Sequence, residues 1–120
     1  MSFKVVRKNE ATRYEVPNHF DVRTTRIHNP EDVNDGHLVL GMSHFLPGGG
    51  ANASPAKTDT IYYVVTGEMT VELYDDADKI SKFILGPGDS VHFGKGTKRS
   101  CLNTGSECVK MLVVQSMSLA

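Results

Sequence analysis

The chain has 120 residues, and a few of its polar side chains stand where they could do ionic or acid–base chemistry. Arg99 alternates with Cys101 and Asn103, so these three side chains share one face of a short predicted strand. His44 stands on the more apolar face of the run 38–46, which predicts that its side chain points inward. Because imidazole titrates near neutral pH, His44 is the first candidate for a general base or hydrogen-bond donor. A lone histidine on an apolar face is nevertheless more often a satisfied core residue.

Arg99 is the most informative of these residues, because its guanidinium is charged at every working pH. In a partly dry pocket such a group needs an anionic partner, since an unpaired buried charge is strongly unfavourable. Three arrangements are open. Arg99 could bind a ligand carboxylate, phosphate or enolate through a bidentate contact. It could form an internal ion pair with Asp59, or turn out to solvent.

The elements that must position these residues are short runs rich in Val, Ile, Leu, Tyr and Phe, separated by Gly, Pro, Asn and Asp. This pattern predicts an antiparallel sandwich or barrel. The runs are Leu38–Leu46, Ile61–Leu73, Lys82–Leu85, Ser90–Phe93, Arg99–Asn103 and Val109–Gln115, with less regular strands expected at Phe3–Val6, Thr12–Val16 and Phe20–Ile27. One helical turn is predicted at Pro30–Asn34, with Asn29 as its cap.

Two segments resemble the two sequence motifs of the cupin superfamily. The first is Gly48–Glu68, and the second runs from Gly88 through Gly96 to Asn103. The resemblance implies an all-β fold, a double-stranded β-helix or jelly-roll barrel, forming a single domain over residues 1–120. The barrel is expected over residues 37–116. Residues 1–36 would form an N-terminal strand arm that covers a sheet edge or pairs across a homodimer.

The residues that bind metal in many cupins are replaced. Those proteins carry two histidines and a glutamate in the first motif and a third histidine in the second. The corresponding residues here are Ser54, Ala56, Thr60 and Arg99. In some members the glutamate stands one residue earlier, at the position of Asp59. A guanidinium at the third histidine position would repel a divalent ion, so no cofactor is predicted.

The strand after Asp59 has two possible registers. If the strand is regular, Asp59 and Tyr63 face inward. If a bulge lies near Gly67, Thr60 and Tyr62 face inward instead. We favour the register that places Asp59 inside.

In cupins the strand face that carries Arg99 lines the barrel, so the resemblance implies that Arg99 anchors a small, polar or anionic molecule. His44 would be the base or donor, and the other ligand-binding candidates are Tyr62, Tyr63, Asp59, Thr60 and Cys101. If the protein is an enzyme, proton transfer of the isomerase, epimerase or lyase type suits this set. One alternative is a metallo-cupin with atypical ligands, an oxygenase or isomerase using His44, Asp59 and Cys101. Another is a non-catalytic sensing or accessory barrel.

The other polar residues, the net charge and the hydrophobic runs exclude several classes of protein. We interpret the other histidines as surface or loop residues: His19, His28, His37 and His92. A net charge of −1 with interspersed signs gives no basis for nucleic-acid or membrane binding. A cytoplasmic location is expected, because neither a signal-type hydrophobic region nor a membrane-length apolar run is present. Cys101 and Cys108 are predicted to be free thiols in such a compartment.

Overall fold

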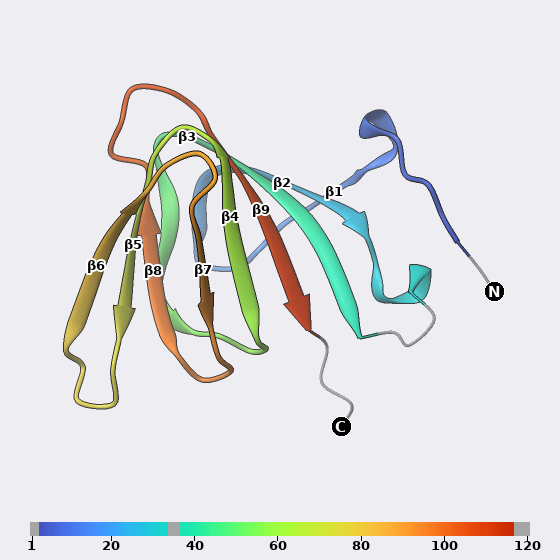
Figure 1. The fold of residues 1–120 in the computed structure, drawn as a ribbon. Helices are drawn as coiled ribbons and strands as arrows, with labels where there is room; N and C mark the ends of the chain where they lie inside the picture. The colour runs from blue at the N-terminus through green and yellow to red at the C-terminus, as the bar shows by residue number, and fades with distance from the viewer. Residues whose placement is uncertain (1–2, 34–36, 117–120) are drawn as a thin grey trace.

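The computed structural model describes residues 3–33 and 37–116, and within these ranges it is a curled antiparallel β-sheet (Figure 1). The strands are β1 (Thr12–Tyr14), β2 (His19–His28), β3 (Leu38–Pro55), β4 (Thr60–Thr66), β5 (Met69–Tyr74), β6 (Ile80–Leu85), β7 (Ser90–Phe93), β8 (Lys98–Leu102) and β9 (Val109–Ser116). Two short 3₁₀ turns, η1 (Lys8–Glu10) and η2 (Pro30–Asp32), lie in the N-terminal part. The helical turn predicted at Pro30–Asn34 is present as a 3₁₀ turn over Pro30–Asp32, and Asn34 lies outside the described residues.

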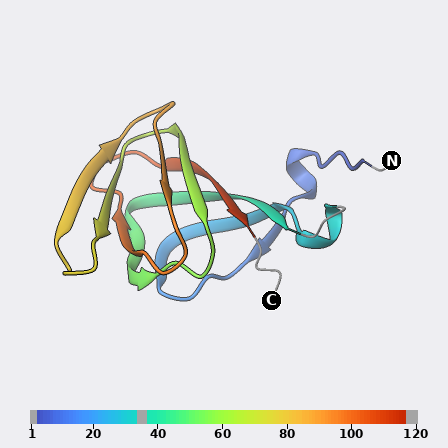
Figure 2. The ribbon, with the colours of Figure 1, turned by 60° about the horizontal axis from the view of Figure 1, so that its bottom comes forward.

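The strand order across the sheet is β6-β5-β8-β3-β9-β4-β7, and β2 pairs along β3 with β1 at its outer edge. The sheet folds over so that β4, β7 and β9 face β5, β6 and β8, as the two views show (Figures 1 and 2). This arrangement confirms the predicted double-stranded β-helix. The N-terminal run 3–6 is not a strand, and the predicted run 61–73 divides at Gly67 into β4 and β5.

β3 joins the two layers because it bends at a glycine-rich segment. Its first half pairs with β9, and its second half, from Gly50, pairs with β8. A Cβ atom at Gly49 would lie 2.2 Å from the carbonyl oxygen of Asp21, and one at Gly50 would lie 2.1 Å from that of Cys101. Only glycine permits these backbones to approach so closely.

This close approach predicts a large effect for a small substitution. Gly50→Ala should lower the free energy of unfolding by more than about 3 kcal/mol, because a backbone oxygen cannot move away without breaking the β3–β8 pairing. Gly86→Ala is the matched control, since the nearest atom to its added Cβ would be the Asp89 carboxylate at 3.8 Å. Urea unfolding followed by circular dichroism measures both. Equal loss in the two variants would show that the clash is not the cause.

The core lies between the two layers and is mainly apolar, and Thr60, Thr70 and Asn103 are among the few polar residues that are also buried. Its centre comprises Phe45, Ala51, Val64, Met69, Val71, Phe93, Val109 and Met111. On β3 the buried face is Val39, Gly41, Ser43 and Phe45. The prediction that His44 points into the barrel is therefore wrong. Both faces of β3 carry apolar residues, so hydrophobicity alone did not identify the inner one.

Within the described part of the chain, no helix is long and apolar enough to cross a membrane.

Candidate functional site

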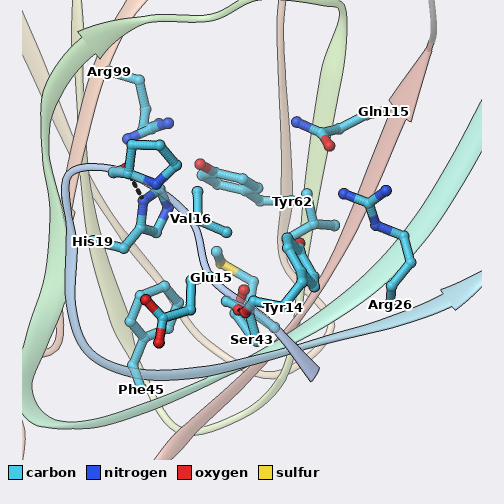
Figure 3. A pocket seen from close by; sticks show the side chains of 14 residues that line it. Tyr14, Glu15, Val16, His19, Arg26, Ser43, Phe45, Tyr62, Arg99 and Gln115 are labelled. Atoms are coloured by element: carbon cyan, nitrogen blue, oxygen red, sulfur yellow. Dashed lines mark hydrogen bonds between the residues drawn. The ribbon is translucent and has the colours of Figure 1, made fainter. Parts of the chain in front are cut away.

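A cavity of about 250 Å³ lies inside the barrel, between the β1–β2 connection and the inner faces of β3, β4, β8 and β9 (Figure 3). Its ionisable lining residues are Tyr14, Glu15, His19, Arg26, Tyr62 and Arg99. Gln115 and Ser43 add an amide and a hydroxyl. The rest of the lining is largely apolar, as is usual for pockets that bind small molecules.

The β1–β2 connection supplies much of this polar lining. The chain turns at Asn18, whose φ of 63° is one that asparagine tolerates better than most residues. The backbone N–H of Asn52 on β3 donates to the Asn18 carbonyl over 2.8 Å and ties the connection to the barrel. Tyr14, Glu15 and His19 are thereby held over the cavity (Figure 3).

Arg99 enters the cavity from β8, where it pairs with Ser54 of β3 and Leu73 of β5. Its residue is only 9% exposed, and its Nε and Nη1 atoms have no hydrogen-bond partner among the described residues. The guanidinium carbon lies 6.0 Å from the centroid of the Tyr62 ring, within reach of a cation–π interaction. This contact positions the charge but leaves its N–H donors free for another acceptor.

Tyr62 forms the wall beside Arg99. Its ring meets Phe93 edge to face, with 5.0 Å between centroids. Burial raises the pKa of Tyr62, so its hydroxyl stays protonated and can donate a hydrogen bond. Tyr63 points the other way and is exposed, so of the two tyrosines named as ligand-binding candidates only Tyr62 lines the cavity.

Thr60, not Asp59, faces inward. Thr60 is 3% exposed, and its hydroxyl donates to the Thr58 carbonyl over 3.0 Å. Asp59 has a side chain that is 61% exposed, with Oδ1 3.0 Å from Nε2 of His92. Our preference for Asp59 is wrong because the pairing of β4 with β9 shifts between Val64 and Thr66, a bulge that reverses the inward set. Arg99 therefore has no ion pair with Asp59 and is not turned to solvent.

The exposed Asp59–His92 pair supports a prediction. Asp59→Ala should change the free energy of unfolding by less than about 0.5 kcal/mol, because surface pairs contribute little. Ligand binding in the cavity should be unchanged. Thermal unfolding of Asp59→Ala with and without ligand tests both expectations. If the ligand no longer raised the Tm of this variant, Asp59 would be part of the binding site.

His44 lies outside the barrel. It lines a separate hollow between the N-terminal segment and the outer face of β2 and β3. Burial lowers the pKa of His44, and a hydrogen bond with the backbone of Arg23 offsets only part of this effect. Cys101 is a core residue, and burial raises the pKa of its thiol to about 11, so it is not a thiolate at neutral pH. The predicted roles of His44 and Cys101 in lining the site are therefore wrong.

His19 is a functional candidate that the sequence interpretation missed. Its Nδ1 lies 2.9 Å from the Pro17 carbonyl oxygen, which can only accept, so Nδ1 carries the hydrogen and Nε2 keeps a lone pair. Burial lowers the pKa of His19, the charge of Arg99 lowers it further, and the Pro17 contact opposes both. The cavity thus contains a neutral imidazole with a basic nitrogen. Because His19 lies beside an irregular segment, no periodic sequence pattern indicated that its side chain lines the cavity.

The other missed residues are Arg26, Gln115, Tyr14 and Glu15. For Arg26 and Gln115 the strand alternation did indicate an inward side chain. Arg26 is two residues from the buried Thr24 on β2, and Gln115 continues the inward alternation of Val109 and Met111 on β9.

The sequence between residues 41 and 115 matches the family model described as "Cupin domain". The chain belongs to the cupin family. This cupin is 34% identical over 117 residues to a Mycobacterium tuberculosis (strain H37Rv) protein named β-D-galactosidase, covering 98% of this chain and 97% of the relative.

Solved structures of other cupins share its fold. The polyketide cyclase RemF from Streptomyces resistomycificus has a TM-score of 0.78 at 18% identity, covering 98% of this chain and 81% of the other. A predicted oxalate decarboxylase from Thermotoga maritima has a TM-score of 0.77 at 21% identity, covering 96% and 100%. The cupin domain of Drosophila melanogaster CENP-C has a TM-score of 0.74 at 22% identity, covering 98% and 83%. At these identities the likeness concerns the fold alone.

The side chains of this cupin do not fit the metal that many family members hold. The motif positions carry a hydroxyl at Ser54, a methyl at Ala56, a hydroxyl already bonded to backbone at Thr60, and the Arg99 guanidinium. None of these is an imidazole or carboxylate, which such a site requires.

The alternative set of metal ligands does not form a site either. His44, Asp59 and Cys101 lie on the outer sheet face, on the surface and in the core, so the structure does not bring them together. No cluster of three or more His, Cys, Asp or Glu side chains suited to a metal occurs in residues 3–33 and 37–116.

Proposed function

We propose that this cupin binds a small anionic organic molecule in its barrel without a metal ion, with Arg99 as the anchor for the anion. The observation that carries the proposal is the buried guanidinium of Arg99, with Nε and Nη1 unpartnered inside a cavity. Burying such a charge without a partner is unfavourable by several kcal/mol, and a bidentate carboxylate would satisfy it. Tyr62 and Gln115 supply further hydrogen bonds around the same space.

The proposed chemistry is proton transfer next to the anionic group, as in an isomerase, epimerase or lyase. Nε2 of His19 would take the proton, and its Pro17 contact fixes the required tautomer. Arg99 would stabilise the enolate that forms, because its charge is already in place. His19 thus takes the role that the sequence interpretation gave to His44.

The proposed ligand is a sugar acid. The name of the mycobacterial relative points to a carbohydrate, and Arg99 adds the requirement for an acidic group. The cavity has room for roughly one monosaccharide. D-galacturonate has both features and serves as the first probe.

The test compares D-galacturonate with D-galactose in thermal unfolding of the wild type and of Arg99→Gln. Galacturonate should raise the Tm of the wild type in a saturable way, and galactose should not. The variant should lose the galacturonate response, while Lys98→Gln, on the opposite face of β8, should keep it. A response that survives in Arg99→Gln would overturn the anchor.

A second candidate is glycoside hydrolysis, suggested by the relative's name. The usual mechanism needs two carboxylates flanking the glycosidic bond. Glu15 is the single carboxylate that lines the cavity within the described residues. If the cupin releases nitrophenol from nitrophenyl β-D-galactoside, and Glu15→Gln abolishes the release, hydrolysis replaces proton transfer as the proposed reaction.

A homodimer remains our prediction for the assembly. Phe3 is 91% exposed, and Ile61, Tyr63 and Val65 expose apolar surface on the outer face of β4. Sedimentation equilibrium should give about twice the 13.1 kDa chain mass, and Ile61→Lys should reduce it. A wild-type protein of one chain mass at micromolar concentration would contradict this. The cytoplasmic location is likewise a proposal.

A further inference from the structure

We infer that the ligand carries an anionic group at each end, one bound by Arg99 and the other by Arg26, and so belongs to the small polyhydroxylated dicarboxylates. This inference rests on the proposed function, since it accepts Arg99 as the first anchor. It adds a second anchor that neither the motifs nor the comparisons indicate.

Arg26 reaches the cavity from β2 and resembles Arg99 in its unmet hydrogen-bonding capacity. Its Nε is buried without a hydrogen-bond partner in residues 3–33 and 37–116. Its guanidinium carbon lies 4.4 Å from the centroid of the Tyr14 ring, a cation–π contact that holds the side chain in place. A ring face accepts none of the in-plane N–H bonds, so those donors remain available.

The two guanidinium groups stand at different ends of the cavity. On β3, the register pairs Arg26 with Gly41 in the first half and Arg99 with Ser54 in the second, beyond the glycine bend. Figure 3 shows Arg99 and Arg26 on opposite sides of the space, with Tyr62 between them. With the Tyr62 ring between the two guanidinium groups, a molecule with two carboxylates can place one at each end.

The remaining groups match such a dianion. Glu15 is the one acidic lining residue in the described part of the chain, and it is exposed, so solvent screens its charge. Gln115, Ser43 and the Tyr62 hydroxyl are neutral partners suited to hydroxyl groups along the middle of the ligand. An aldaric acid, a sugar with a carboxylate at both ends, has this pattern.

The experiment uses three six-carbon probes that differ in their end groups: galactarate has two carboxylates, D-galacturonate has one and galactitol has none. Affinities for the whole protein are measured by isothermal titration calorimetry. We expect galactarate to bind on the order of tenfold more tightly than galacturonate, as one added charge-assisted contact would give, and galactitol not to bind. Adipate and hexanoate repeat the comparison without hydroxyl groups.

Arg26→Gln should bring galactarate down to the affinity of galacturonate, while Arg26→Lys should keep part of the preference. Circular dichroism confirms that each variant is folded. An unchanged galactarate preference in Arg26→Gln would overturn the second anchor but leave Arg99 and the proposed function intact. If binding of every probe is independent of Arg99, the proposed function fails as well. Equal affinity of the wild type for dianions and monoanions would also overturn the inference.

Discussion

Replacing Arg99 with methionine should make the unliganded protein more stable and at the same time nearly abolish anion binding. The stability gain follows because Arg99 is 9% exposed and its Nε and Nη1 have no partner among the described residues. Exchanging a buried charge for an apolar side chain of similar length should stabilise by about 1–3 kcal/mol. Loss of the anchor should weaken galacturonate binding on the order of 100-fold.

These opposite effects distinguish a binding residue from a structural one. If Arg99 had a structural role, its substitution would make the protein less stable, because the hydrogen-bond partners of Arg99 would be left unsatisfied. Chemical denaturation measures the first effect and calorimetry the second. Lys98→Met, on the other face of β8, should change neither by more than about 0.5 kcal/mol. A less stable Arg99→Met that still binds galacturonate would contradict the account.

Replacing His19 with glutamine should slow proton exchange at the carbon next to the ligand carboxylate by about 10²- to 10⁴-fold. The wild type should replace the C5 hydrogen of galacturonate with deuterium in D₂O, which proton NMR records directly. His44→Gln is the matched control: it also removes an imidazole, but one outside the cavity, and should leave the rate unchanged. A wild type that binds galacturonate without any exchange would contradict the proposed proton transfer at this carbon.

The pH dependence of this exchange follows from the environment of His19. Burial, and then the charge of Arg99, lower the pKa of His19 below its usual value of 6.5. A base with a lowered pKa stays deprotonated at neutral pH, so the rate should be flat there and fall only below that usual value. Stability should change in the same direction: it is lost as pH falls from about 6.5 towards the folded-state pKa, because the unfolded state binds the proton more readily. His19→Gln should reduce both dependences.

Much of the fold could be predicted because several of its turns require a backbone conformation that few residue types other than glycine adopt. Gly48, Gly67, Gly88 and Gly96 all have positive φ values, between 81° and 90°. Such conformations strongly favour glycine, so their spacing identified the barrel corners. The all-β class followed from the short apolar runs between turn residues, and the barrel was implied by the resemblance to the cupin motifs.

The site was less predictable because it depends on register and on a connection with no periodic pattern. A single shifted pairing near Thr66 exchanged Asp59 for Thr60, and two apolar faces on β3 concealed the outward direction of His44. His19 reached the cavity through the turn at Asn18, which periodicity does not describe. Alternation grouped Arg99 with Cys101 and Asn103, which are all buried, and the resemblance to cupins implied that their shared face lines the barrel.

Contact between the Arg99 guanidinium and the ligand's anionic group can be followed through the ¹H–¹⁵N resonance of the Arg99 Nε–H. The resonance is identified by its loss in Arg99→Lys and followed while galactarate or galacturonate is added. We expect a saturable shift and slower exchange of this proton with water, with the same dissociation constant that calorimetry gives. A bound ligand that leaves the Arg99 resonance unmoved would contradict this contact.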